Sequence, residues 1–90
     1  MAGLKDKVVL VTGASSGIGK GTATHMAGLG CKLALVARNA EALAQVAEEC
    51  KAAGSPDVLV APHDLSVEEE CVKAIDETVE HFGGEQNLFL

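Results

Sequence analysis

Three short apolar runs recur along this chain of 90 residues, and a segment with helical spacing follows each one. The runs are Val8–Val11, Leu33–Val36 and Val58–Ala61. Short continuous apolar runs are typical of strands buried on both faces of a parallel sheet, whereas a half-exposed strand alternates apolar with polar residues. The sequence therefore predicts an α/β fold in which strands and helices alternate.

Two helices are predicted between these strands. The first is expected over about residues 17–29, before Gly30, and the second over about residues 40–53, after Asn39 and before Gly54. An Asn just before the first turn and a glycine just past the last turn are common helix-end signals. The expected apolar stripes comprise Ile18, Thr22, Met26 and Leu29 in the first helix and Leu43, Val46, Ala47 and Cys50 in the second.

A third helix is predicted over residues 67–82. Ser66 and Glu69 have the spacing of a capping box, in which each side chain accepts a hydrogen bond from the other residue's backbone N–H. The pair Gly83–Gly84 is expected to end the helix. The apolar face is expected to comprise Val72, Ile75, Val79 and Phe82.

The order of these elements also predicts their arrangement in space. Right-handed crossovers place the first two helices on one face of a sheet ordered 3-2-1 and the third helix on the opposite face. The fold class is thus a three-layer, doubly wound (Rossmann-like) parallel sheet that is truncated after β-α-β-α-β-α, with residues 88–90 as the start of a fourth strand. Residues 1–90 are expected to form the N-terminal part of one domain.

A glycine-rich segment, Thr12–Gly19, joins the first strand to the first helix. Glycine tolerates positive φ and close approach to a ligand, and the first turn of a helix offers unpaired N–H groups to an anion such as a pyrophosphate. The alternative is a strand-to-helix loop that binds nothing, but the strand before it and the helix and second strand after it favour a phosphate site. The candidate phosphate-binding residues are Gly13, Ser15, Ser16, Gly17, Ile18 and Gly19.

This segment has the pattern T-G-x-x-x-G-x-G, in which the chain resembles the short-chain dehydrogenases/reductases. The resemblance runs from about Leu4 to Gly84 and covers the first part of a family domain. It implies a doubly wound nucleotide-binding domain and hydride transfer between NAD(P) and an alcohol or carbonyl carbon. It also implies that Asp64 contacts the adenine and that Leu65 packs on its ring. From the residues alone, Asp64 is interpreted as a turn residue near the cap at Ser66.

The end of the second strand predicts which nucleotide is preferred. In this fold an acidic residue there binds the ribose hydroxyls of NAD, whereas an Arg accommodates the 2′-phosphate of NADP. Residues 36–39 contain Arg38 and Asn39 and no acid. A guanidinium can bind phosphate through two hydrogen bonds, so NADP is expected in preference to NAD. An Arg solvated at the strand end is the alternative.

No catalytic residue is predicted. The family resemblance implies a catalytic Tyr, a Lys and a Ser, but this sequence contains no Tyr and ends before the positions where the Ser and the Lys would fall. His25, His63 and His81 have no sequence neighbours that would form a catalytic set, and we expect them to be solvated. Three irregularly spaced cysteines, without C-x-x-C, predict buried or half-buried thiols and no metal site.

Composition restricts the partners. The net charge is −6, which argues against nucleic-acid binding, since that would need a basic face. No apolar run approaches a membrane span and residues 1–7 contain no long apolar segment, so a cytoplasmic chain without membrane contact is expected.

Truncation is expected to leave Val8–Val11 partly bare, because half of one sheet face and one strand edge would lack cover. Two function classes follow. The first is a truncated NADP-dependent oxidoreductase that retains the nucleotide-binding half. The alternative is a non-catalytic nucleotide-binding or interaction module that self-associates, or pairs with a full-length relative, through the uncovered sheet face.

Overall fold

A computed structural model describes residues 5–83 and, for the backbone, residues 87–89. Its strands form one parallel sheet in the order β3-β2-β1-β4. The strands are β1 (Val8–Thr12), β2 (Lys32–Ala37), β3 (Val58–Pro62) and β4 (Asn87–Phe89). The predicted order of the first three strands is confirmed. The expected fourth strand is also present, although its last predicted residue, Leu90, lies outside the described residues.

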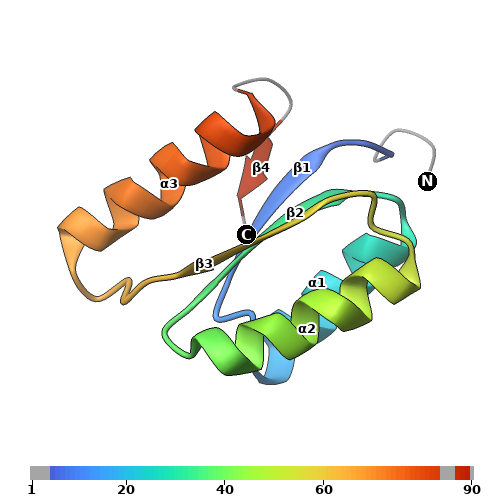
Figure 1. Ribbon diagram of the computed structural model, residues 1–90, viewed down its shortest axis with the longest axis horizontal. Helices are drawn as coiled ribbons and strands as arrows, with labels where there is room; N and C mark the ends of the chain where they lie inside the picture. The colour runs from blue at the N-terminus through green and yellow to red at the C-terminus, as the bar shows by residue number, and fades with distance from the viewer. Residues whose placement is uncertain (1–4, 84–86, 90) are drawn as a thin grey trace.

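The helices lie on both faces of the sheet, as Figure 1 shows. They are α1 (Gly17–Gly28), α2 (Ala40–Ala53) and α3 (Glu68–Phe82). Helices α1 and α2 cover one face and α3 covers the other, which confirms the three-layer, doubly wound arrangement. Two apolar clusters fill the spaces between these layers, one under α1 and α2 and a smaller one under α3.

Strand β1 lies inside the sheet and is buried. Val8–Val11 are each at most 5% exposed, so the expectation that they are partly bare is wrong. The reason is that β4 pairs with Val8–Leu10 along the edge that was expected to be open, while β2 pairs along the other. The helices of the two outer layers then cover both faces.

Helix α2 agrees with the predicted bounds, and α1 differs in its buried face. The four apolar residues predicted for α2 are all buried. In α1 the residues buried against the sheet are Ala23 and Ala27, whose small side chains let the helix lie close to it. Met26 and Leu29 pack at the margin of this cluster, but Ile18 is 90% exposed. Ile18 lies in the first turn, beside a hollow at the end of the sheet, so its predicted place in the apolar stripe is wrong.

Helix α3 departs further from prediction. Its N-cap is Val67, without a side-chain hydrogen bond, so the capping box of Ser66 and Glu69 is not formed. The Ser66 hydroxyl donates instead to Asp64 Oδ1 at 2.6 Å. The residues buried from α3 are Ala74 and Thr78. Of the predicted apolar face, Phe82 packs on the smaller cluster, whereas three residues are exposed by 52%, 45% and 38%: Val72, Ile75 and Val79.

The cysteines are thiols in the expected environments. Cys31 and Cys50 are buried and Cys71 is half-buried. Burial raises the pKa of both buried thiols, which keeps them protonated. Within residues 5–83 and 87–89, no group of three or more His, Cys, Asp or Glu residues is arranged to hold a metal ion. In the same described part, no helix is long and apolar enough to cross a bilayer.

Leu43 tests the packing of α2 on the sheet, because it is fully buried in the larger cluster. We expect Leu43→Ala to lower the free energy of unfolding by about 2–5 kcal/mol, through lost apolar burial and the cavity left behind. Gln45→Ala, at an exposed position of the same helix, should change it by less than about 0.5 kcal/mol. Urea unfolding followed by circular dichroism measures both. Equal effects of the two substitutions would contradict this packing.

Candidate nucleotide-binding site

The turn between β1 and α1 is built from glycines whose geometry excludes other residues. Gly13 and Gly17 have φ of +61° and +52°, in the left-handed region where side chains are strained. Position 19 requires glycine for a different reason. A Cβ at this position would overlap the Gly13 carbonyl group and would lie only 2.6 Å from its carbon atom. The helix and the turn thus touch through backbone atoms.

The N-terminus of α1 is open to an anion. Its N-cap, Ser16, is extended and makes no side-chain capping hydrogen bond, and the first turn contains no acidic residue. Helix α2 differs, because Asn39 Oδ1 accepts the Ala42 N–H at 3.0 Å. Helix α3 begins with three consecutive glutamates. An uncapped N-terminus directs backbone N–H groups and the positive end of the helix dipole outward, which suits a phosphate group.

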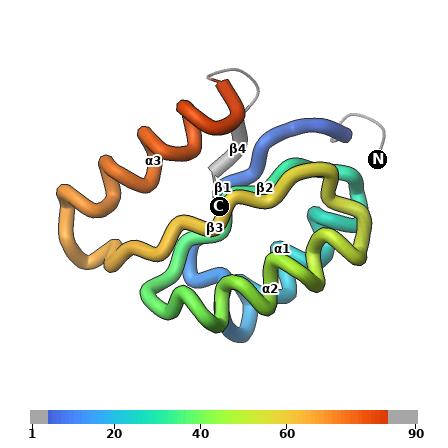
Figure 2. Tube along the Cα trace, viewed as in Figure 1, coloured from blue at the N-terminus to red at the C-terminus, as the bar shows by residue number. Residues whose placement is uncertain are grey.

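A hollow of about 350 Å³ lies where β1, β2 and β3 end. Backbone hydrogen bonds join the three loops around it: Ala14 N–H donates to the Val36 carbonyl at 3.2 Å, and His63 N–H donates to the Ala37 carbonyl at 2.9 Å. Figure 2 shows these three connections gathered at one end of the sheet. We call this hollow the strand-end pocket. Its lining residues are Gly13, Ser15, Val36, Ala37, Arg38, Asn39, His63, Asp64 and Leu65.

Six of the ten predicted site residues therefore lie around one hollow, and they come from three separate loops. A second hollow, of about 480 Å³, adjoins the same turn. It is lined by Val11, Thr12, Gly13, Ile18, Gly19 and Thr22. Gly13 lines both hollows. Ser16 and Gly17 lead from the turn into α1.

The wall contributed by β2 carries one positive charge. Arg38 is exposed and directly follows the strand. Its neighbour Asn39 lines the pocket as predicted, and its side-chain oxygen also caps α2. Sequence reasoning missed Val36 and Ala37 as lining residues, because a strand residue that reaches the end of the sheet has no local signal of its own.

The opposite wall is the loop between β3 and α3. Asp64 Oδ1 accepts hydrogen bonds from the Ser66 hydroxyl at 2.6 Å and from the Ser66 N–H at 3.0 Å. These bonds, with a smaller contribution from the Arg38 charge, hold the pKa of the Asp64 carboxyl below its usual value. Leu65 is half-buried and packs on the cluster under α3. An ionised carboxylate beside an apolar side chain is suited to a heterocycle that carries N–H donors.

His63 was expected to be solvated, and that expectation is wrong. Its side chain is only 11% exposed. Its ring nitrogens Nδ1 and Nε2 lie 2.7 Å from Glu70 Oε1 and 2.7 Å from Glu77 Oε1. Glu70 and Glu77 lie seven and fourteen residues after His63 in the sequence. Both belong to α3, and the helical period places them on the same face of that helix.

Comparison with known proteins agrees with this geometry. The sequence model of the family described as short chain dehydrogenase matches residues 7–88. The chain belongs to the short-chain dehydrogenase family. This confirms the resemblance inferred from Thr12–Gly19.

Two relatives in this family are much longer than the chain. It is 56% identical over 77 residues to 11-beta-hydroxysteroid dehydrogenase-like 2 of Arabidopsis thaliana, which covers 86% of this chain and 25% of the relative. It is 53% identical over 77 residues to 11-beta-hydroxysteroid dehydrogenase A of Arachis hypogaea, covering 86% of this chain and 22% of the relative. The chain thus spans about a quarter of the length of these relatives.

Solved structures of the family share the fold. A crystal structure of L-sorbose reductase from Gluconobacter frateurii, complexed with NADPH and L-sorbose, aligns with a TM-score of 0.87 and 32% identity over 92% of this chain and 32% of that chain. A short-chain type dehydrogenase/reductase from Mycobacterium marinum aligns with a TM-score of 0.84 and 34% identity, covering 90% and 32%. A short-chain dehydrogenase fold over this region is therefore shown.

Gly19 and Gly21 make a matched pair for testing the turn. Gly19→Ala should lower the free energy of unfolding by about 1–3 kcal/mol, because the new methyl overlaps the Gly13 carbonyl. Gly21→Ala places its methyl in open space on the same helix and should raise the stability by up to about 1 kcal/mol. Urea unfolding followed by circular dichroism separates them, and a stable Gly19→Ala variant would contradict the described contact.

Proposed function

We propose that this chain is the NADP(H)-binding part of a hydride-transferring oxidoreductase. The observation that carries the proposal is the strand-end pocket, in which Arg38, Asp64 and the glycine turn meet. One wall is cationic, one wall holds an ionised carboxylate beside Leu65, and the floor leads to the open N-terminus of α1.

These residues would hold distinct parts of the nucleotide. The turn from Gly13 to Gly19 and the first N–H groups of α1 would bind the pyrophosphate. The guanidinium of Arg38 would bind the 2′-phosphate through two hydrogen bonds. Asp64 and Leu65 would contact the adenine. When bound, NADP(H) supplies or accepts the hydride.

The preference for NADP rests on Arg38. Among the solved relatives, the sorbose reductase is complexed with NADPH, whereas a 3-ketoacyl-(acyl-carrier-protein) reductase from Brucella melitensis is complexed with NADH. The fold therefore accommodates both nucleotides. Because residues 36–39 contain a cation and no acid, the charge in this chain favours the nucleotide with the additional phosphate.

Hydride transfer is proposed for a protein in which the remainder of a family domain completes the site. The chain itself contains no Tyr, so it cannot supply the proton donor that the family resemblance implies. What the described residues contribute is binding and orientation. Ile18 is one of the residues that would contribute, because its exposed side chain borders the second hollow next to the turn.

Arg38→Ala tests the nucleotide preference. We expect it to weaken NADPH binding about ten- to hundredfold, as loss of charge-assisted hydrogen bonds of about 1.5–3 kcal/mol implies. NADH binding should change by less than about threefold, because NADH lacks the 2′-phosphate. Isothermal titration calorimetry of both nucleotides measures these effects.

Lys51→Ala is the charge-matched control, since Lys51 lies in the last turn of α2 and pairs only loosely with Glu48 at 3.8 Å. It should leave both affinities unchanged. Equal losses of NADPH affinity in the Lys51 and Arg38 variants would show a general charge effect and contradict the assigned role. Absence of NADPH binding to the unaltered chain would contradict the proposed function itself.

A second candidate is an interaction module, favoured by the apolar stripe of α3. Val72, Ile75 and Val79 lie on one side of the helix and are exposed, while β1, the surface first expected to be bare, is covered. Exposed apolar stripes of this kind mark contact surfaces. Under this reading two copies of the chain associate through α3.

The double variant Ile75→Ser, Val79→Ser tests the second candidate. Self-association should appear in sedimentation analysis as a mass that rises with concentration, and the double variant should remain monomeric because the shared apolar surface is lost. Val67→Ser, at an exposed valine that lies outside the stripe, should associate like the unaltered chain. A chain that is monomeric at every concentration would eliminate this candidate.

A further inference from the structure

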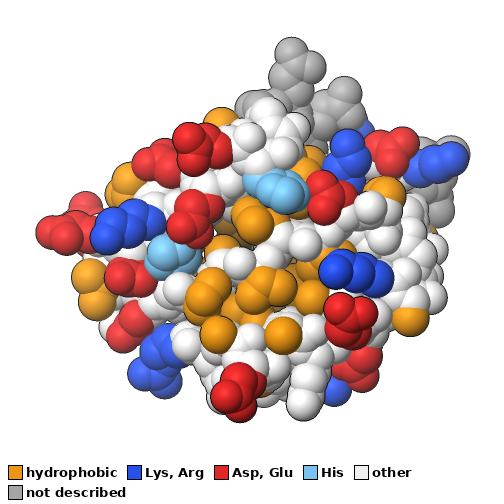
Figure 3. All heavy atoms as spheres, viewed as in Figure 1, with side chains coloured by type: hydrophobic (Ala, Val, Ile, Leu, Met, Phe, Trp, Pro, Cys, Tyr) orange, Lys and Arg blue, Asp and Glu red, His pale blue; other side chains and the backbone are white. Residues whose placement is uncertain are grey.

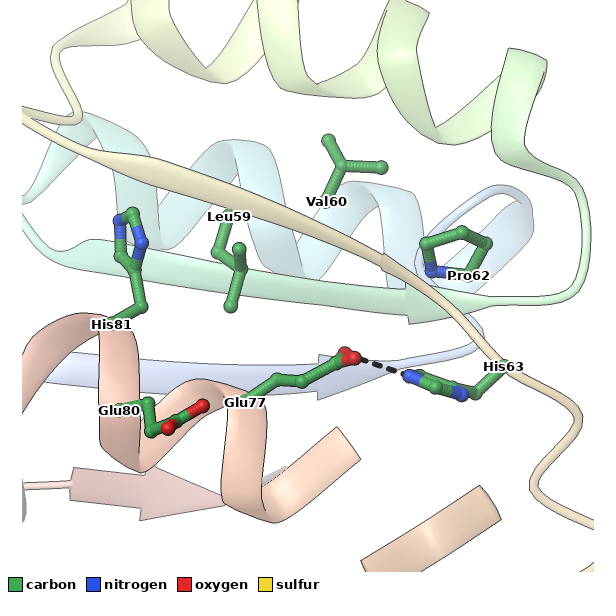
Figure 4. A pocket seen from close by; sticks show the side chains of 7 residues that line it. All are labelled: Leu59, Val60, Pro62, His63, Glu77, Glu80 and His81. Atoms are coloured by element: carbon green, nitrogen blue, oxygen red, sulfur yellow. Dashed lines mark hydrogen bonds and ion pairs between the residues drawn. The ribbon is translucent and has the colours of Figure 1, made fainter. Parts of the chain in front are cut away.

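His63 lies between the strand-end pocket and a separate groove along β3, an edge strand of the sheet. It lines both. The groove, of about 510 Å³, lies between β3 and α3 and is lined by Leu59, Val60, Pro62, His63, Glu77, Glu80 and His81. Figure 4 shows Glu77 reaching from α3 to His63 at the end of β3. The ring therefore joins the end of the strand to the helix of the outer layer.

One carboxylate oxygen links His63 to the loop that carries Asp64 and Leu65 in the strand-end pocket. Glu70 Oε1 lies 2.7 Å from His63 Nδ1 and also accepts the Asp64 backbone N–H at 3.3 Å. The Asp64 carboxylate in turn accepts hydrogen bonds from the N–H and the hydroxyl of Ser66. The position of Glu70 thus sets the position of the loop that carries Asp64 and Leu65.

Only the charged form of His63 satisfies both contacts. A neutral imidazole has one N–H donor and one acceptor nitrogen, whereas an imidazolium donates from both nitrogens. Here both nitrogens face carboxylate oxygens. Hydrogen bonds to Glu77 and Glu70 raise the pKa of His63 above its ordinary value, and the bond from His63 lowers the pKa of Glu70.

The neighbouring elements place several acidic groups and two basic groups around His63. Helix α3 presents Glu70, Glu77 and Glu80, with Lys73 acting on Glu70, and Figure 3 shows acidic side chains gathered over this helix. Asp64 lies on the loop, and Arg38 faces it across the strand-end pocket. At the far end of the groove His81 pairs with Asp57. When His63 loses its proton, this acidic surrounding becomes more negative and less favourable to a phosphate-bearing ligand.

We propose that His63 is a positioning residue that, in its imidazolium form, locks the Asp64–Leu65 loop onto α3 and so couples nucleotide affinity to pH. The inference rests on the proposed function and adds to it a regulation of the same site. Loss of the proton leaves a nitrogen lone pair against one of the two carboxylates, so the ring no longer binds Glu70 and Glu77 together and the loop is held less tightly to α3.

The pH range follows from the direction of the shifts. Because the pKa of His63 is raised, the lock is complete below the ordinary His value of about 6.5 and is lost as pH rises through the raised value. Because the pKa of Glu70 is lowered, the lock is retained to below the ordinary Glu value as pH falls. Nucleotide affinity should therefore fall as pH rises above the ordinary His value.

The test is calorimetric titration of the chain with NADPH and with NADH between about pH 6 and 9. Both affinities should fall at least about threefold as pH rises. The 2′-phosphate of NADPH cannot produce this result, because its own deprotonation, near a pKa of about 6, would strengthen binding to Arg38 as pH rises. NADH lacks that phosphate and should show the same fall.

Three variants separate positioning from structural support alone. His63→Gln should bind NADH with an affinity that no longer depends on pH in this range, whereas His81→Gln, which alters the outer pair with Asp57, should keep the dependence. Glu77→Gln should move the midpoint of the fall to lower pH, because one of the two hydrogen bonds that raise the His63 pKa is weakened.

A measurement on the unaltered chain makes the inference independent of variant folding. Nuclear magnetic resonance of the His63 ring should show a pKa that NADH raises, because a ligand favoured by the imidazolium must favour the imidazolium in return. A His63 pKa unchanged by saturating NADH, or equal pH dependence in the unaltered and His63→Gln chains, would overturn the inference while nucleotide binding stands. Failure to bind either nucleotide at any pH would overturn the proposed function and the inference with it.

Discussion

The structure depends on the burial of one strand. Every side chain from Val8 to Val11 is removed from solvent, which requires a neighbour on both edges of β1 and a helical layer on both faces. Parallel pairing forces each connection to cross over the sheet, so the same requirement places α1 and α2 on one side and α3 on the other. It also brings the carboxyl ends of β1, β2 and β3 to one edge, where loops distant in sequence line a common hollow.

Elements with local signals were predicted well. Helix α2 has its predicted bounds because Asn39 caps its own third following residue and Gly54 takes the positive φ, both short-range effects. The capping box of α3 was mispredicted for an equally local reason. Asp64 and Ser66 are two residues apart and form a turn of their own, and this turn takes the hydroxyl that a capping box would need.

The candidate site divides in the same way. The glycine turn is readable from the sequence, because positive φ and backbone contact leave glycine as the residue that fits. The role of His63 is not, since its partners Glu70 and Glu77 become neighbours only when α3 lies along β3. The exposed residues Val72, Ile75 and Val79 of α3 were mispredicted as buried, because helical spacing defines an apolar stripe but not which stripe faces the sheet. Ala74 and Thr78 occupy that position and permit a closer approach.

The backbone contact between Gly19 and Gly13 has a consequence for binding. A turn held by its own packing has its shape before any anion arrives, so little conformational entropy is lost when one binds. Its N–H groups need not be reoriented for each new ligand. Discrimination between ligands is then left to the loops around the pocket. Exposed side chains there, such as Arg38, can change conformation, whereas the turn is rigid.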